Sequence, residues 1–253
     1  MYDPPAYIWA ITITTAAGIA AATCAVLYTG AQRAGLGRGR AALVSGAAAV
    51  IFGGWLAASA VIAGHGWYDT RLGHQVPWLP VSVAGFLVLL LVLRQIPVVT
   101  RALSAPGMTS RLLLPHSFRV EGVVFLLYLA LGHLPAVFAL PAGLGDLATG
   151  LAAPLVARRL ADGTGRRAAW WFNAFGLTDL ITALTLGALT EYQLLHVAPS
   201  GAPIAELPLA LIPTVGVPIL FVLHIESLRT LARARRAPLA ATARRTAEAA
   251  PRA

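Results

Sequence analysis

The sequence predicts an all-α, polytopic membrane protein: a bundle of seven transmembrane helices with the N-terminus outside and the C-terminus in the cytoplasm. Hydrophobic residues make up 58% of the 253 residues and charged residues only 11%, and the mean hydropathy is +0.74. A typical soluble domain carries about 25% charged residues. Because a bilayer core of about 30 Å is crossed by roughly 20 apolar residues in a helix, long apolar runs are predicted to be spans. The alternating segments typical of membrane β-barrels are absent from the sequence.

Seven apolar stretches are long enough to cross a bilayer. They run over residues 7–29, 41–63, 80–100, 118–139, 141–158, 168–190 and 207–229. The fifth is the shortest, and only Leu140 separates it from the fourth. Residues 1–236 are therefore predicted to form a single transmembrane domain. The basic segment 237–253 is predicted to be a cytoplasmic tail, either disordered or a helix loosely bound to the membrane.

The first two helices and the seventh have compositions with direct structural consequences. The first two are dense in Ala and Gly, which favours close helix–helix packing. Cys24 is the only cysteine, so no disulfide forms within the chain. The seventh helix contains Pro213 and Pro218, and two prolines in one span favour a kink or local unwinding.

The orientation follows from arginine, because the chain contains no lysine. Segments 30–40, 101–119 and 158–167 are rich in arginine, whereas the opposite loops contain only Arg71. Basic loops stay in the cytoplasm, so the N-terminus is predicted to be outside and the protein to be a multi-pass plasma-membrane protein. This distribution explains the net charge of +9 without nucleic-acid binding. The cytoplasmic arginines are expected to contact anionic lipid headgroups. Abundant Ala, Gly and Arg with no lysine favours a bacterial source.

Two aspartates fall inside predicted spans, in the similar sequences GLGDL (143–147) and GLTDL (176–180). Ionisable residues at such depth usually face the bundle interior and mark a site. At 1.5 Å of rise per residue, an outer-to-central polar layer is predicted, with His133 within reach of Asp146. The glycines of both sequences are predicted to let these helices approach a neighbour closely. The candidate substrate- or proton-binding residues are His133, Asp146, Asp179, Thr149 and Thr182.

A second polar layer is predicted nearer the cytoplasm. It contains Arg94, Gln95, Glu121, Asn173 and His224, bordered by His116, Arg119 and Glu226. Because a carboxylate in lipid needs a partner, Arg94 is predicted to pair with Glu121, fixing the third helix against the fourth.

Metal and cofactor sites are not indicated. The loop 64–78 contains His65, Asp69 and His74, but their spacing matches no zinc pattern, so no metal site is predicted. The absence of lysine excludes a retinal Schiff base. The sequence names no cofactor and resembles no family closely enough to assign one, and the oligomeric state stays open.

Three classes of function fit these observations. The first is a transporter-like protein that handles a small solute or ion, coupled to protons through Asp146 and Asp179. The second is a membrane-embedded enzyme that acts on a lipid or isoprenoid with the same acids. The third is a structural or accessory subunit whose polar layers only specify helix pairing. An apolar cavity open to lipid favours the second class, and a water-filled vestibule favours the first.

Overall fold

The computed structural model describes residues 3–73 and 76–248, with side chains up to residue 234, and every regular element in this part of the chain is helical. This confirms the all-α membrane class. Six helices are long and apolar enough to cross a membrane, or seven when a bent pair counts as one span. Their outward faces carry large apolar side chains such as Val50, Leu151 and Ile181, as expected for surfaces that meet lipid.

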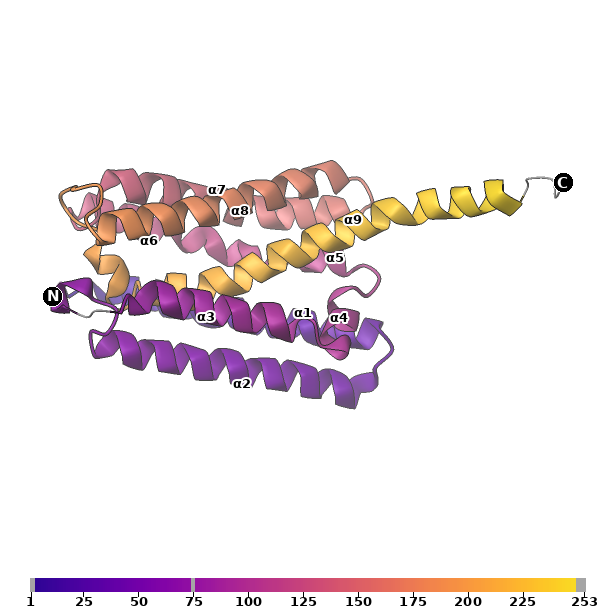
Figure 1. The fold of residues 1–253 in the computed structure, drawn as a ribbon, viewed down its shortest axis with the longest axis horizontal. Coiled ribbons are helices and arrows are strands. Elements are labelled where there is room, and N and C mark those ends of the chain that lie inside the picture. The colour runs from indigo at the N-terminus through magenta and orange to yellow at the C-terminus, as the bar shows by residue number, and fades with distance from the viewer. Residues whose placement is uncertain (1–2, 74–75, 249–253) are drawn as a thin grey trace.

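The long helices lie side by side as a bundle (Figure 1). α1 (Ala6–Arg33) packs against α2 (Gly37–Gly64), and α7 (Ala136–Ala161) packs against α8 (Arg166–Glu191). α9 (Val217–Glu248) contacts both α3 (Trp78–Leu93) and α8. We call the end at which α1 begins and α8 ends the amino end of the bundle, and the end from which α9 leaves the carboxyl end. Which end lies in the cytoplasm stays a prediction.

The predicted third span, 80–100, is bent. α3 and α4 (Pro97–Leu103) meet at 90°. Proline disfavours helical backbone in the residue before it, and Ile96 is accordingly in an extended conformation with ψ of 128°. The short connection turns α4 away from the axis of α3 at the carboxyl end.

The fourth and fifth spans differ from the predicted 118–139 and 141–158. The fourth runs over Met108–Ala130 through α5 (Met108–Arg111), the 3₁₀ helix η2 (Leu114–Gly122) and α6 (Val123–Ala130). Gly132, with φ of 76°, follows the end of α6, and Pro135 caps the start of α7. α7 then continues through Pro141, so the fourth and fifth spans both begin earlier than the sequence suggested.

The predicted distortion of the last span is present. Residues Ile212–Gly216 form a π-helical turn, η4, which leads into α9. Pro218 has no N–H to offer the carbonyl of Thr214 four residues earlier. That carbonyl instead accepts a hydrogen bond of 2.8 Å from the Trp55 indole of α2. The freed backbone group therefore ties α2 to the last span.

Two further segments complete the fold at its edges. The short helix η1 (Thr70–Leu72) lies in the connection between α2 and α3, and η3 (Ala202–Ala205) lies in the connection between α8 and η4. The side chains of the predicted tail 237–253 lie outside the described part of the chain. Its backbone belongs to α9 as far as Glu248, and residues 249–253 lie outside the described residues. The cytoplasmic placement of the tail stays a prediction.

Candidate functional site

Arg119 forms the centre of a buried charge cluster. Its side chain is fully buried, and its Nε donates a hydrogen bond of 2.6 Å to Oδ1 of Asp146. Nη2 donates to Oδ2 of Asp179, and Nη1 donates to the carbonyl of Gly176 at 3.3 Å. The guanidinium, with donors in a fixed planar arrangement, thus joins η2 to α7 and α8. We call Arg119, Asp146 and Asp179 the Arg119 cluster.

The cluster lies at the middle of the spans. Residue 119 is the midpoint of the span Met108–Ala130, and Asp146 and Asp179 lie within three residues of the midpoints of α7 and α8. A charge at that depth is the costliest to place in a bilayer, so mutual pairing is what makes it tolerable. The two predicted polar layers therefore meet here, since Arg119 was placed at the inner border and the aspartates in the outer layer.

The glycines of GLGDL and GLTDL bring the helices close enough for this pairing. A β-carbon at Gly145 would lie 2.5 Å from Cγ of Asp179, inside van der Waals contact. A β-carbon at Gly176 would collide with the ring of His224 and lie 3.2 Å from Nη1 of Arg119. The predicted close approach at these glycines is confirmed, and it serves the charge cluster directly.

A chain of hydrogen bonds leads from Arg119 through His224 and Asn173 to Ser227, and joins the cluster to α9. Arginine only donates, so Nε2 of His224 accepts from Arg119 at 3.3 Å. Nδ1 of His224 must then carry the proton, which it donates to Oδ1 of Asn173 at 2.9 Å. The Asn173 amide donates to the hydroxyl of Ser227 at 2.9 Å. The ring of His116 stacks on His224 with centroids 3.9 Å apart, and neither ring nitrogen of His116 has a hydrogen-bond partner among the described residues.

A third carboxyl group stands beside the cluster. Glu121 is 4% exposed and close enough for its charge to interact with Asp146 and Arg119. One guanidinium thus faces three carboxyl groups. If the cluster is electrically neutral, two of these carboxyl groups hold protons.

The other predicted site residues occupy different places. His133 lies in the connection between α6 and α7, with its ring centroid 6.5 Å from that of Tyr128. Asp146 lies ten residues into α7, about 15 Å along its axis, and its ion pair is with Arg119. Thr149 donates within α7 to the carbonyl of Gly145, whereas Thr182 is a half-buried residue of α8. The ion pair described for Asp146 is therefore with Arg119, and the proximity of His133 to Asp146 stays a prediction.

The predicted pair of Arg94 with Glu121 is wrong. Arg94 instead donates to Glu226 of α9, and Glu226 also lies 3.5 Å from Arg229. Arg94 follows α3 at the carboxyl end, whereas Glu121 lies near mid-membrane in η2, because the fourth span begins about ten residues earlier than predicted. Gln95, in the turn after α3, is exposed and donates to the carbonyl of Leu91 in α3. Arg94 also lines an apolar cavity of about 320 Å³ between α1, α2, α3 and α9.

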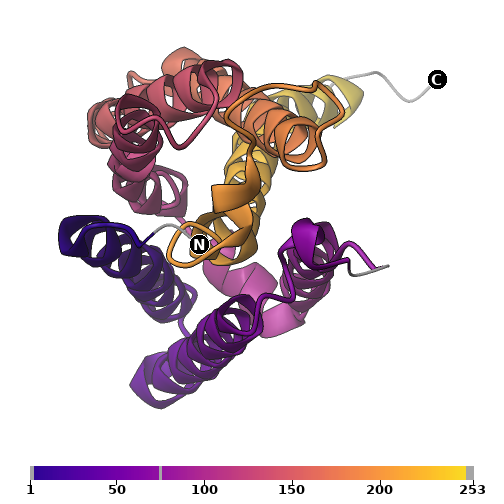
Figure 2. The ribbon, with the colours of Figure 1, turned by 90° about the vertical axis from the view of Figure 1, so that its left-hand side faces the viewer.

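A second cavity connects the Arg119 cluster to the surface of the bundle. It has a volume of about 310 Å³ and lies between α3 and α8, with Asp146 at one end. In the view along the bundle, α3 and α8 lie on two sides of the start of α9 (Figure 2). The lining residues repeat on each helix at intervals that place them on one face: Leu79, Pro80, Val83, Ala84 and Leu87 from α3, and Ala183, Leu184, Gly187, Ala188 and Glu191 from α8. We call this space the α3–α8 cavity.

Nearly every side chain that lines the α3–α8 cavity is apolar. The exceptions are Asp146, Glu191 and the hydroxyl of Tyr192. Leu180 lines the deep end and Glu191 follows it by eleven residues, so the cavity extends roughly 16 Å along α8. That length is about half the bilayer core. The cavity therefore runs from mid-membrane to the amino end of the bundle.

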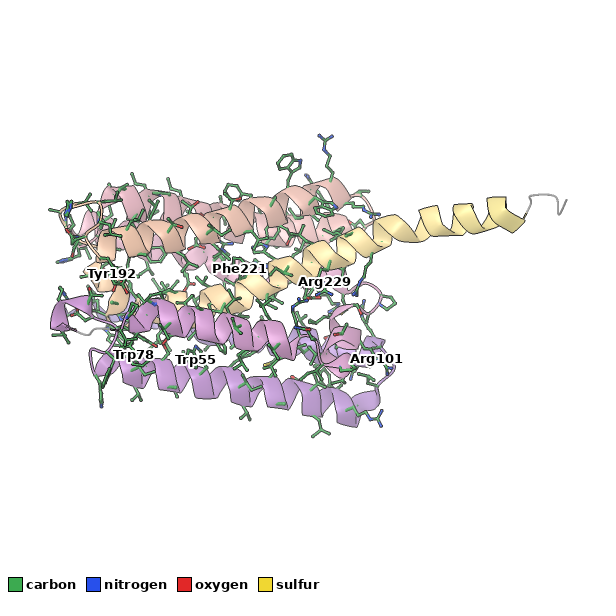
Figure 3. The ribbon with its side chains drawn as sticks, viewed as in Figure 1. Trp55, Trp78, Arg101, Tyr192, Phe221 and Arg229 are labelled. Atoms are coloured by element: carbon green, nitrogen blue, oxygen red, sulfur yellow. The ribbon has the colours of Figure 1, made fainter. Side chains whose placement is uncertain are left out.

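A separate group of charges lies near Glu191 at the amino end of this cavity, outside its lining. Arg71 donates to both oxygens of Asp69, at 2.9 and 2.8 Å, and to Glu206. These hydrogen bonds, chiefly to Asp69, raise the pKa of Arg71 further above its usual range. Burial and the nearby Glu191 raise the pKa of the Tyr192 phenol to about 12. Figure 3 shows Tyr192 and Trp78 at this end, and Arg101 and Arg229 at the opposite one.

The histidines and acids of the outer loop form no metal-binding group in the described residues. Asp69 binds Arg71, His74 lies outside the described residues, and no set of three His, Cys, Asp or Glu side chains is gathered around one point in residues 3–73 and 76–234. The role of His65 and Asp69 as metal ligands therefore receives no support from their placement.

Residues 76–232 match the family described as "Domain of unknown function (DUF8737)". The chain belongs to this family. The matched domain contains the whole Arg119 cluster and every residue of the α3–α8 cavity, and it begins two residues before α3. No curated protein and no solved structure matches the chain.

Arg119 is the central residue of the site, and the sequence pattern does not single it out. A fourth span that starts at residue 118 groups Arg119 with the loop arginines that set orientation. One signal pointed to it: Arg119 has apolar runs on both sides, LLLP before and VVFLLYLALG after. A second was charge balance, since two aspartates in lipid require a cation at the same depth.

Proposed function

We propose that this integral membrane protein binds the hydrocarbon part of a membrane lipid or isoprenoid in the α3–α8 cavity, beside the Arg119 cluster. The observation that carries the proposal is the lining of the cavity. Ligand sites are typically apolar spaces of about 300–1,000 Å³ with a few polar groups, and this cavity fits the lower end of that range. An apolar wall is poorly suited to a hydrated ion or a sugar, because no donor or acceptor replaces the water that such a solute gives up.

The dimensions of the cavity also favour a lipid. A space of roughly 16 Å from mid-membrane to one end of the bundle matches the depth of one leaflet. A hydrocarbon chain that enters between α3 and α8 therefore stays in the half of the bilayer where it already lies. At the deep end, Oδ1 of Asp146 accepts from Arg119, and Oδ2 accepts no hydrogen bond from the described residues. That oxygen is available to a polar group, or to an acidic C–H bond, of the bound molecule. If the protein is an enzyme, proton transfer to or from Asp146 is therefore the reaction that this site supports.

Filling the cavity should prevent binding. In liposomes containing a diazirine-labelled long-chain alcohol, irradiation is expected to label α3 and α8 on the faces that line the cavity. Ala183→Phe places a ring in this space and is expected to reduce the labelling about tenfold, because overpacking costs about 1–3 kcal/mol. The labelled peptides are identified and quantified by mass spectrometry.

Ala174→Phe is the matched control, because Ala174 is an exposed residue of the same helix and does not line the cavity. Its labelling is expected to equal that of the wild type. Label spread over outward residues such as Val50 and Leu151, with no change in Ala183→Phe, would contradict the proposal. Thermal unfolding of both variants in detergent checks that each is folded.

The charge count of the Arg119 cluster favours proton-coupled transport as a second candidate. One arginine faces Asp146, Asp179 and Glu121 in mid-membrane, so the number of bound protons changes whenever a ligand or conformational change alters this balance. The apolar cavity supplies a route for an apolar substrate rather than for a hydrated ion. Transport in this form therefore uses the same binding site as the first proposal.

Proton movement is measurable without knowing the substrate. In liposomes that enclose a pH-sensitive dye, the wild-type protein is expected to speed the decay of an imposed pH gradient. The double variant Asp146→Asn and Asp179→Asn is expected to return the decay to the rate of empty liposomes. Asp162→Asn, an exposed aspartate after α7, is the matched control and is expected to behave like the wild type. Equal rates in the wild type and the double variant would exclude proton coupling through these residues.

A further inference from the structure

The amino end of the α3–α8 cavity contains polar groups without partners. Glu191 is 5% exposed, and its Oε1 is shielded from solvent with no hydrogen-bond partner among the described residues. The hydroxyl of Tyr192 is also shielded and without a partner there. Both residues line the cavity. A buried acceptor without a hydrogen bond costs roughly 1–3 kcal/mol of folding free energy. Such groups in a cavity wall therefore indicate that a bound molecule supplies the missing hydrogen bonds.

The charges around this end select the kind of partner. Among the described residues, Arg71 is the cation near Asp69, Glu191 and Glu206, and it is already bonded to Asp69 and Glu206. Glu191 is therefore the carboxyl group of this set that has no hydrogen bond to Arg71. The pKa of Tyr192, raised to about 12, keeps its hydroxyl protonated at neutral pH, so it is able both to donate and to accept. The carboxyl groups at this end repel an anionic head group, whereas a head group that donates hydrogen bonds is complementary to them.

We propose that Glu191 and Tyr192 bind the head group of a single-chain amphiphile whose polar end donates hydrogen bonds, an amine or an alcohol, while its chain occupies the α3–α8 cavity. This inference rests on the proposed lipid-binding function and names its ligand class. The head group lies at the amino end of the bundle, where Tyr192 stands (Figure 3). The chain extends past Ala188 and Ala183 toward Leu180 and Asp146. A carboxylate or phosphate ester of the same chain length is a poor ligand, because its head group offers only hydrogen-bond acceptors to Oε1 of Glu191, which is itself an acceptor.

Competition against the diazirine-labelled alcohol tests the head-group preference. Unlabelled dodecylamine, dodecanol and dodecanoate have equal chain lengths that suit a cavity of roughly 16 Å, and they differ in the head group. On the wild-type protein, we expect the amine and the alcohol to compete at least about tenfold more strongly than the carboxylate, because the carboxylate brings no donor for Oε1 of Glu191 and adds a negative charge beside Asp69 and Glu206. Competition by dodecanoate equal to or stronger than that by the amine would overturn the inference.

Two conservative variants test whether Glu191 and Tyr192 cause the head-group preference. Glu191→Gln removes the charge while keeping the shape, and is expected to weaken competition by the amine about tenfold with a smaller effect on the alcohol. Tyr192→Phe removes only the hydroxyl and is expected to weaken both about threefold or more. Glu206→Gln removes a carboxylate from the same end without touching the cavity wall, and is the matched control. Its effect on the amine is expected to be smaller than that of Glu191→Gln.

The possible failures are distinguishable. If labelling in the cavity is lost in Ala183→Phe but all three amphiphiles compete equally, the head-group inference is wrong and the lipid-binding function stands. If no labelling depends on the cavity, the proposed function itself fails. If Glu191→Gln does not fold, the comparison of amphiphiles on the wild type and the Tyr192→Phe variant still decides the inference, because neither depends on that variant.

Discussion

Replacing Arg119 with methionine is expected to lower the free energy of unfolding by about 3–5 kcal/mol. Arg119 is fully buried at mid-span and is the ion-pair partner of both Asp146 and Asp179. Methionine keeps the apolar length of the side chain but leaves the two carboxyl groups without a cation in a medium of low dielectric constant. Unfolding of the purified protein by SDS in mixed micelles, followed by tryptophan fluorescence, measures the difference.

Removing all three charges together should restore much of the lost stability. The triple variant Arg119→Met, Asp146→Asn and Asp179→Asn is expected to recover at least half of the loss, because the two carboxylates that form ion pairs with Arg119 are removed together with it. Arg119→Lys keeps the charge but not the planar set of donors, so an intermediate loss is expected. If Arg119→Met unfolds within about 1 kcal/mol of the wild type, or the triple variant is no more stable than the single one, charge pairing does not hold the bundle at this point.

The sequence was sufficient to identify Asp146 and Asp179, because depth in an apolar run is a local property. Each aspartate lies in the middle of a run of about 20 apolar residues, and each follows a glycine within three positions. Helical geometry and the cost of a charge in lipid then place both on the inside of the bundle. The proline-rich start of the last span was predictable for the same reason, since Pro218 removes a specific backbone hydrogen bond.

The partners of these aspartates were harder to predict, because a partner depends on the register between spans. Fixing the fourth span at 118–139 placed Arg119 at its cytoplasmic edge and moved Glu121 to the depth of Arg94. The 3₁₀ helix η2 carries the chain through Pro115 and keeps residues 114–122 inside the span, which apolar length alone does not reveal. With that register Arg119 reaches both aspartates, and Arg94 at the carboxyl end reaches Glu226 instead.

A single methyl group at Gly145 is expected to destabilise the protein by about 1–3 kcal/mol and to separate Asp179 from Arg119. The β-carbon of alanine at this position would lie 2.5 Å from Cγ of Asp179. The Asp179 carboxylate is held by Arg119, so it moves away only by giving up that ion pair. Gly145→Ala is measured by the same SDS unfolding, and proton movement in liposomes reports whether the Arg119 cluster is intact.

Gly54→Ala distinguishes a collision from a general effect of changing glycine. Gly54 lies inside α2 with nothing within 4 Å of a β-carbon, so alanine there is expected to stabilise the helix by about 0.5–1 kcal/mol. A second comparison uses Asp179→Ala, which removes the group that the methyl group would strike. In that background, Gly145→Ala is expected to cost less than in the wild type, by about 0.5 kcal/mol or more. An equal cost in both backgrounds would mean that Gly145 is needed for the packing of α7 elsewhere and not for the position of Asp179. A lower cost in the Asp179→Ala background would mean that the glycines of both sequences serve one charge cluster, because Gly145 of α7 makes room for Asp179 and Gly176 of α8 makes room for His224 and Arg119.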